Sequence, residues 1–324
     1  MGTGTFFDLI TEGISIPLTK LASGYKPQGL IADQVFPVVG HPIGMGQIPI
    51  FGKDAFNVYE TRRARLAKSN RATISPDSWI DFACVEHDLA IPMDSQELQK
   101  LKNIPGDRQL KALFDLENRT RRRVQWNMAL GKEGALSEIA QATESYPSGH
   151  FVILSNGDCW SETGSTPIQD IETGREAIRA ALGVYPNTMF MGASSYATLK
   201  FHPQYQALMN ANKDKIVTTD LIAMTHDLKK VVIGLSMGKG IDGAFYDLWG
   251  DNVLLAYIPD TTTPDVDEPS FGYTITPSFS DTPYPYVDIF EEEGGKIVNV
   301  RCTDNYTQVF TMPMAGYLIK NTKK

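Results

Sequence analysis

The stretch VVIGLSMGKGIDGAFYDLWGDNVLLAYIPD, Val231 to Asp260, contains a G-x-G-x-x-G pattern at Gly238, Gly240 and Gly243. A β-prone run precedes it and an acid lies twenty residues after Gly240, as in a dinucleotide-binding fingerprint. Such a site needs a helix after the glycines, and a crossover between parallel strands takes about a dozen residues or more. Only AFYDLWGDN, which includes the turn sequence 250–252, separates Gly243 from the next β-prone run. The stretch therefore predicts strand, loop and strand, and we expect no nucleotide cofactor.

Other patterns that imitate catalytic motifs are also incomplete. In GLSMGKG, residues 234–240, three residues separate the glycines where a phosphate loop has four. The sequence GASSY, residues 192–196, lacks the second glycine of a nucleophile elbow, so we expect Ser194 or Ser195 to cap a helix. The five histidines have no metal-ligand spacing. We therefore expect a protein that is not an enzyme and holds no cofactor or metal.

Composition describes a globular protein made in a reducing compartment. The chain has 324 residues, of which 42% are hydrophobic and 21% charged. A net charge of −8 argues against an exposed nucleic-acid-binding surface as the main function. Three scattered cysteines, Cys84, Cys159 and Cys302, do not form a disulfide framework. The N-terminus does not resemble a signal peptide, and no run of about 18 apolar residues occurs.

Two segments near the N-terminus are expected to extend from the body of the protein. Residues 1–40 combine many Gly and Pro with many large apolar residues, which predicts an extended arm that packs on the body or on a neighbour. Two β-prone runs, 47–60 and 78–90, flank a basic segment without acids, which predicts a long hairpin with a cationic outer end. The cations of this end are Arg62, Arg63, Arg65, Lys68 and Arg71.

An acidic segment balances this basic one. Residues 260–293 contain nine Asp or Glu and no Lys or Arg, and they end in Glu291, Glu292 and Glu293. Opposite charges distributed in this way can steer one copy of a chain onto another. The hypothesis is that the basic loop contacts the acidic segment of an adjacent subunit.

Two helices and an α/β region are also predicted. Apolar residues at three- and four-residue steps predict a long helix from about Met93 to Gly131, with Gly131 and Gly134 at its end. On this helix we expect Glu117 to pair with Arg121 and Asp115 with Arg119, and the run 121–123 to form salt bridges rather than a nucleic-acid patch.

In the segment 165–186, Thr166 and Gln169 predict a capping box, and Pro167 suits the first helical position. Gly183 predicts the end of this second helix. Residues 187–260 alternate between strand and helix patterns, and the tail from residue 287 predicts antiparallel strands.

In their order along the chain and their residue patterns, these segments resemble the tailed-bacteriophage major capsid proteins of the Hong-Kong-97-like fold over nearly the whole chain. ADQVFPVV and IPIFGKDAFNVYETRRARLAKSNR resemble the arm and extended loop, and DLENRTRRRVQWNMAL resembles the spine helix. TPIQDIETGREAIRAAL, PNTMFMGASSYATLKFHPQY, DLKKVVIG and WGDNVLLAYIP resemble the segments that enter and form the axial lobe. PSFGYTITP and AGYLIKN resemble the closing segments.

The resemblance implies an α+β fold with an N-terminal arm, an extended β-hairpin loop, a long spine helix, a peripheral domain and an inserted α/β axial domain. It implies the division 1–40 arm, 41–90 extended loop, 91–185 peripheral domain, 186–284 axial domain and 285–324 returning strands of the peripheral domain. The extended loop and arm would reach over neighbouring subunits.

The implied function is a phage major capsid protein that self-assembles, in the host cytoplasm, into hexamers and pentamers of an icosahedral shell of the virion. Expected partners are further copies of the chain, a separate scaffolding protein, a portal, a cement protein and packaged double-stranded DNA without sequence-specific contacts. The alternatives are an encapsulin-like shell that encloses cargo enzymes and, from another class, a nucleotide-binding oxidoreductase.

Overall fold

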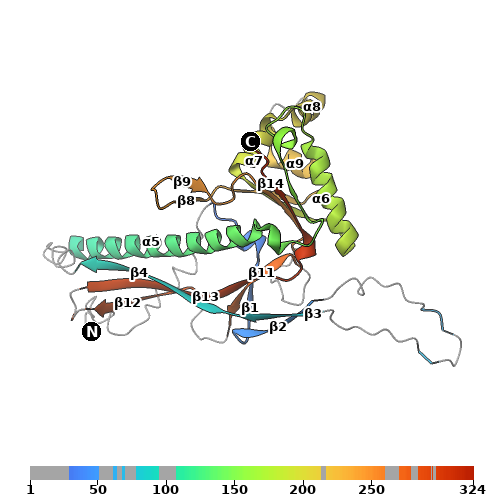
Figure 1. The fold of residues 1–324 in the computed structure, drawn as a ribbon. Coiled ribbons are helices and arrows are strands. Elements are labelled where there is room, and N and C mark those ends of the chain that lie inside the picture. The colour runs from blue at the N-terminus through green and yellow to red at the C-terminus, as the bar shows by residue number, and fades with distance from the viewer. Residues whose placement is uncertain are drawn as a thin grey trace.

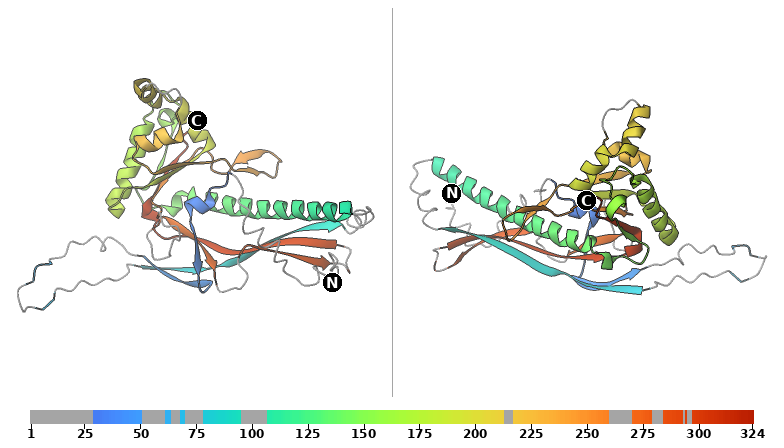
Figure 2. Two further views of the ribbon diagram at one scale, coloured as in Figure 1. Left: turned by 180° about the vertical axis from the view of Figure 1, so that it is seen from behind. Right: turned by 45° about the horizontal axis from the view of Figure 1, so that its top comes forward.

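The computed structural model describes residues 29–50, 61–63, 68–69, 78–94, 107–212, 217–259, 270–278, 284–292, 294 and 297–324. Its elements form a long lower layer, which we call the platform, and a compact upper lobe that stands on one end of it (Figure 1). Two narrow ribbons project from these bodies (Figure 2).

The platform is a five-stranded sheet covered by one long helix. Its elements are α3 (Ala32–Val35), β1 (Val38–His41), β4 (Val85–Asp94), α5 (Asp107–Ala140), β11 (Gly272–Pro277), β12 (Tyr286–Glu292) and β13 (Ile297–Phe310). The strands follow the order β1-β11-β13-β12. The fifth strand, β4, lies outside this order and pairs with residues 297–306 of β13. Only β1 runs parallel to its partner, β11, among these pairings. The sheet is therefore built around β13, whose 14 residues contact three neighbouring strands.

Alternating residues of β13 pack against α5. Val298, Val300 and Cys302 are at most 1% exposed and form one cluster with Val124 of the helix. Since side chains alternate between the faces of a strand, this spacing turns all three toward α5. The predicted antiparallel strands of the tail are thus confirmed, and their apolar face packs against α5.

The long helix α5 ends later than its glycines predict. The prediction of an end at Gly131 and Gly134 is wrong, because the helix continues through both glycines to Ala140. Leu136 and Ala140 in the last turns are fully buried. Their burial outweighs the roughly 1 kcal/mol that each interior glycine costs a helix. The start predicted near Met93 is also wrong, because Met93 belongs to β4.

The upper lobe is a second five-stranded sheet with helices packed on it. Its elements are β5 (Phe151–Ile153), α6 (Pro167–Leu182), β6 (Thr188–Gly192), α7 (Ala193–Phe201), α8 (Pro203–Asn212), α9 (Thr219–Thr225), β7 (Lys230–Gly234), β10 (Val253–Ala256) and β14 (Gly316–Lys320). The strand order is β5-β14-β10-β6-β7. Trp160, Phe190 and Leu255 are almost wholly buried in its core. The predicted α/β region is confirmed, since β6 and β7 are parallel and helices connect them.

The helix termini of this lobe follow the sequence in part. The helix α6 begins at Pro167 and ends at Gly183, whose φ of 79° is the left-handed conformation that glycine favours. The capping box is wrong, because the Thr166 side chain makes no cap hydrogen bond. The expectation that Ser194 or Ser195 caps a helix is also wrong. Gly192 is the N-cap of α7, and Ser195 lies inside the helix, where its hydroxyl contacts Thr322 at 2.7 Å.

Two ribbons complete the structure (Figures 1 and 2). One consists of β2 (Met45–Ile50) and β3 (Ser78–Ala83), and the other of β8 (Met237–Lys239) and β9 (Phe245–Asp247). The second ribbon contains the glycines of the fingerprint, with Gly243 in the turn at a φ of 82°. An antiparallel hairpin therefore stands where a nucleotide site would need a helix, whereas the sequence predicted only a loop between two strands. Short 3₁₀ helices cover 143–145, 156–158 and 313–315.

The sheet pairings also locate the segments of the predicted domain division. β5 and α6, from the segment 91–185, pack with the upper lobe, and β14, from the segment 285–324, pairs there with β10 and β5. β12 and β13 lie in the platform. Within the described ranges, no helix has both the length and the hydrophobicity to cross a bilayer.

Candidate subunit interface

The ribbon β2–β3 has one packed face and one open face. On the packed face, Ile48 and Phe82 are at most 5% exposed and contact a platform cluster that includes Tyr273. On the open face, Met45 is 66% and Trp79 56% exposed. The ribbon is thus held to the platform by one face and offers apolar surface on the other.

The ribbon is continuous with the platform sheet. β3 and β4 are separated only by Cys84, whose backbone N–H donates to Gly44 O at 2.7 Å. One extended segment, residues 78–94, therefore pairs first with β2 and then with β13. This continuity fixes the direction in which the ribbon leaves the platform, and it confirms the antiparallel base of the predicted hairpin.

The predicted basic end of the hairpin is described in part. Arg62, Arg63 and Lys68 are exposed, and Arg63 Nη1 donates to Ser69 Oγ at 3.2 Å. Arg65 and Arg71 lie outside the described residues. Three exposed cations are therefore present where the sequence predicted them.

The predicted acidic partners lie at the other end of the molecule. Glu291 and Glu292 are exposed at the end of β12, and Glu293 lies outside the described residues. Residues 61–63 and 68–69 lie beyond the far end of the β2–β3 ribbon in both views (Figures 1 and 2). Asp288 is not open for such a contact, because Arg301 binds its carboxylate through two hydrogen bonds of 3.0 and 2.6 Å. One chain therefore does not bring its basic loop and its exposed β12 acids together.

The ribbon β8–β9 exposes a second set of apolar side chains. Met237 is 49%, Phe245 72% and Tyr246 53% exposed, and Ile241 in the connecting turn is fully exposed. An isolated two-stranded hairpin is marginally stable in water at best, and monomers rarely expose contiguous apolar surface of this kind. The sequence predicted only a glycine-rich loop here and not this apolar surface. The available signal was the density of large apolar residues in a turn region.

The root of the N-terminal arm is tied to α5 by a buried carboxylate. Glu133 is fully buried, and its Oε2 accepts the backbone N–H of Ala32 at 2.7 Å and that of Ile31 at 3.0 Å. Its Oε1 accepts from Trp249 Nε1 at 2.6 Å and from Ser236 Oγ at 3.1 Å. Glu133 therefore joins the arm, α5 and both flanks of the β8–β9 ribbon. The signal in the sequence was weak: a lone glutamate between two glycines of a helix.

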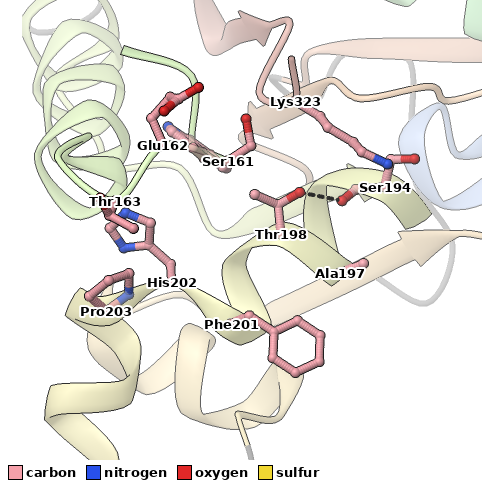
Figure 3. Close-up of a pocket in the computed structure, with 11 residues that line it drawn as sticks. Ser161, Glu162, Thr163, Ser194, Ala197, Thr198, Phe201, His202, Pro203 and Lys323 are labelled. Atoms are coloured by element: carbon pink, nitrogen blue, oxygen red, sulfur yellow. Dashed lines mark hydrogen bonds between the residues drawn. The ribbon is translucent and has the colours of Figure 1, made fainter. Parts of the chain in front are cut away.

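A pocket of about 340 Å³ opens beside α7 in the upper lobe (Figure 3). His202 lies in its wall, but both ring nitrogens are engaged: Nε2 contacts Ser165 Oγ at 3.2 Å, and Nδ1 accepts the Gln204 backbone N–H at 3.2 Å. Glu162 forms an ion pair with Lys324 at 3.5 Å. These polar groups are used within the fold, and the lining residues form no pair of nucleophile and base.

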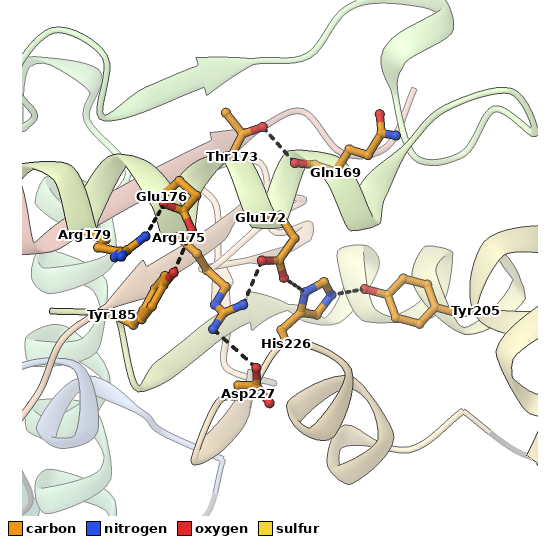
Figure 4. Close-up of polar contacts among 10 residues, drawn as sticks. All are labelled: Gln169, Glu172, Thr173, Arg175, Glu176, Arg179, Tyr185, Tyr205, His226 and Asp227. Atoms are coloured by element: carbon orange, nitrogen blue, oxygen red, sulfur yellow. Dashed lines mark hydrogen bonds and ion pairs between the residues drawn. The ribbon is translucent and has the colours of Figure 1, made fainter.

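A buried histidine network joins the helices of the upper lobe (Figure 4). His226 is fully buried; its Nδ1 lies 2.6 Å from Glu172 Oε1 and its Nε2 2.8 Å from the Tyr205 hydroxyl. Burial lowers the pKa of His226, so the neutral ring donates to Glu172 and accepts from Tyr205. Arg175 binds the other oxygen of Glu172 at 2.7 Å. Among the described residues, Arg175 Nε is buried in this network without a hydrogen-bond partner, and Ser195 is not part of the network.

Among the described residues, no group of three His, Cys, Asp or Glu side chains is placed to hold a metal ion. The two ribbons and the charged ends are among the surfaces that the fold leaves open. This arrangement suits contacts with other macromolecules.

Comparisons with known proteins support the interpretation that the chain contacts other macromolecules. Residues 146–235 match the family model described as phage major capsid protein E. The chain is 36% identical over 307 residues to a major capsid protein of Burkholderia phage BcepMu, with 93% of this chain and 94% of that protein covered.

Two solved structures are similar over almost the full chain. A phage-related protein from Bordetella bronchiseptica RB50 is 28% identical, with a TM-score of 0.74 and coverage of 95% of this chain and 97% of that one. A putative capsid protein of a prophage from E. coli CFT073 is 15% identical, with a TM-score of 0.52 and 99% of each chain covered. The fold is thus the α+β Hong-Kong-97-like capsid fold, and the molecule is a shell protein of that class.

The chain belongs to the phage major capsid proteins, because its identity to the BcepMu protein extends over nearly its whole length. The resemblance seen in the sequence is therefore confirmed, and the protein is a capsid component of the virion. The encapsulin-like alternative has less support, because the relatives of highest identity reported above are phage proteins.

Proposed function

We propose that copies of this chain form hexamers and pentamers of an icosahedral shell that encloses double-stranded DNA. The observation that carries the proposal is the apolar surface on the two ribbons, above all Ile241, Phe245 and Trp79. Burial of apolar area contributes about 25 cal/mol per Å², so covering these side chains with a neighbour favours association. The ribbons, which extend from the body, are well placed to reach an adjacent copy.

The charged ends of the molecule would orient one copy relative to the next in this association. Arg62, Arg63 and Lys68 are exposed at one end of the molecule, and Glu291 and Glu292 at the other. A head-to-tail contact would bring the two sets together between copies, and head-to-tail contacts with a suitable rotation close into rings. We therefore propose that the basic loop of one subunit contacts the β12 end of the next.

The proposed domain roles follow the predicted division, except that β5, α6 and β14 pack with the upper lobe and β11, from the predicted axial segment 186–284, pairs within the platform sheet. The arm (1–40) and extended loop (41–90) reach over neighbours, and the platform around α5 is the peripheral domain. The upper lobe is the axial domain, and we propose that it includes β5, α6 and β14 because they pack with its sheet. Assembly would occur in the host cytoplasm with a separate scaffolding protein, a portal and a cement protein.

The ribbon contact is tested with matched variants of the full chain. In I241S/F245S the apolar contact is lost, so sedimentation and negative-stain microscopy should find few or no shells, with unchanged thermal unfolding of the unassembled chain. In I241L/F245L the apolar contact is kept, so shells should form. Normal shell formation by I241S/F245S would contradict the proposal.

The charge contact is tested by reversal and rescue. R62E/R63E and E291K/E292K should each reduce assembly, and the chain that carries all four changes should assemble again because the charges complement each other in the reverse sense. Full assembly of R62E/R63E alone, or failure of the combined variant to recover, would rule out this contact.

A further inference from the structure

The side of α5 that faces away from the platform carries a line of arginines. Arg119, Arg122, Arg123 and Asn127 are exposed, and Trp126 is 36% exposed. Offsets of three, four, seven and eight residues place these side chains on one side of a helix. We call these five residues the arginine stripe.

The stripe is not part of the packing that holds α5 in place. The opposite side of the same turns is buried, with Val124 in the cluster of β12 and β13. Arg121, between the stripe residues in sequence, is 4% exposed and donates to Asn118 Oδ1 at 3.4 Å. It also lies close to Glu117, whose pKa burial raises and the Arg121 charge lowers. The predicted proximity of Glu117 and Arg121 is therefore confirmed, and the stripe is a separate outer surface.

The stripe is strongly cationic. From Asn118 to Lys132 the chain has five Arg or Lys and no acid. Within the described ranges, Arg119, Arg122 and Arg123 take part in no ion pair. The expectation that the run 121–123 forms salt bridges therefore stays a prediction for its two exposed members, which have no ion pair with the described residues. The physical reason is that the nearest acid on the helix, Glu117, lies on the buried side with Arg121.

The upper lobe does not stand over this part of the helix. It rises above the C-terminal end of α5, and the β8–β9 ribbon extends from it on the side of α5 away from the platform (Figure 1). The stripe covers nine residues, 119–127, and its eight steps of 1.5 Å give a length of about 12 Å. Duplex DNA presents one phosphate charge per roughly 1.7 Å of axis, so this length passes several phosphates.

We infer that the arginine stripe binds the sugar–phosphate backbone of packaged DNA and that this side of α5 therefore lines the inside of the shell. Guanidinium groups offer paired N–H donors that match phosphate oxygens. The inference rests on the proposed enclosure of DNA, and it adds the surface and the residues of contact.

The first test uses the full chain before assembly and a short DNA duplex of arbitrary sequence, with binding followed by fluorescence anisotropy between about 50 and 200 mM salt. For R119Q/R122Q/R123Q the slope of log K against log salt should decrease in magnitude by about three, and the affinity at low salt should fall about tenfold or more. The matched control R62Q/R63Q/K68Q removes the same three charges and should keep the wild-type slope. Equal slopes for the two triple variants would overturn the inference.

Two further measurements separate DNA from other anions and from misfolding. Polyglutamate should compete weakly, and displacement of the duplex at equal charge concentration would overturn DNA as the partner in favour of an acidic polypeptide. In a W79F background, Trp126 is the exposed tryptophan because Trp160 and Trp249 are buried, and binding of the duplex beside it should change its fluorescence. Thermal unfolding should not change in the stripe variant, and R122Q/R123Q should lose a slope of about two.

Closed shells test the position of the stripe. If it lines the interior, intact shells should not bind added duplex through these arginines, whereas binding by shells that is lost in R119Q/R122Q/R123Q would overturn an inside location. The stripe variant should still assemble. Failure of the wild-type chain to form shells would count against the proposed function, while loss of duplex binding in the stripe variant would still support the contact itself.

Discussion

Trp249 donates its indole N–H to Glu133 Oε1 at 2.6 Å, and this bond joins the end of the β8–β9 ribbon to the C-terminal part of α5. The same carboxylate accepts two backbone N–H groups at the root of the arm. Arm, platform and upper lobe are thus held by one buried side chain.

Replacing Glu133 should destabilise the unassembled chain strongly. Glu133→Ala leaves an indole N–H, a hydroxyl and two backbone N–H groups without their acceptor, and each unsatisfied buried group costs about 1–3 kcal/mol. We expect a loss of about 3 kcal/mol or more in the free energy of unfolding, measured by denaturant titration. Glu138→Ala, on the exposed side of the same helix, is the control and should stay within about 0.5 kcal/mol. Equal stability of the two variants would contradict the role of Glu133.

Two glycines should respond to alanine with opposite signs. Gly131 lies inside α5 with open space around it, so Gly131→Ala should stabilise the chain by about 0.5–1 kcal/mol. At Gly192 a Cβ would lie 1.9 Å from the carbonyl oxygen of Gly250, and backbone atoms there must shift. Gly192→Ala should therefore cost several kcal/mol or prevent folding. Thermal unfolding of both variants checks the signs, and a neutral Gly192→Ala would argue against the close approach of these loops.

Stability should fall as the pH decreases through the histidine range. Burial lowers the pKa of His226 and of His202 in the folded chain, so the unfolded chain binds more protons below about pH 6.5. Their contribution to stability is present above that pH and is lost below it, at up to about 1.4 kcal/mol per pH unit for each group. Denaturant titrations from neutral to mildly acidic pH should show this decrease, and His226→Asn should have a smaller pH slope. If His226→Asn left the pH slope of the unfolding free energy unchanged, His226 would have the same pKa in the folded and the unfolded chain.

The cysteines should differ in reactivity. Burial raises the pKa of Cys302 to about 12, and it raises that of the half-buried Cys84 less far. Since the thiolate is the reactive form, iodoacetamide at mildly alkaline pH should modify Cys84 first and Cys302 only after unfolding. Mass spectrometry of timed digests distinguishes the two sites. Early modification of Cys302 would show that the platform core opens locally.

Periodicity and turn chemistry made much of the fold predictable. The alternation of Val298, Val300 and Cys302 identified a strand with one buried face, and Gly183 identified the end of α6. The short segment after Gly243 excluded a nucleotide fold, because too few residues remain there for a crossover helix. The positive charge of the loop could also be predicted, since it follows from the residue types in the sequence alone.

Contacts distant in sequence were not predictable. Gly131 and Gly134 carry a local signal for a helix end, but burial of Leu136 and Ala140 extends α5 past them. Ser195 has the local character of a cap, but the close packing of Thr322 places it inside a helix. The role of Glu133 depends on partners about a hundred residues away on both sides.

The sequence by itself determined the order of arm, loop, helix, α/β region and returning strands, because hydrophobic period, turn residues and charge act over a few neighbours in the chain. Only the tertiary structure decided which surfaces stay open: the apolar turn of the β8–β9 ribbon, the two separated charged ends and the arginine stripe of α5. The reason is that exposure depends on what segments far apart in sequence cover, and that is settled by packing.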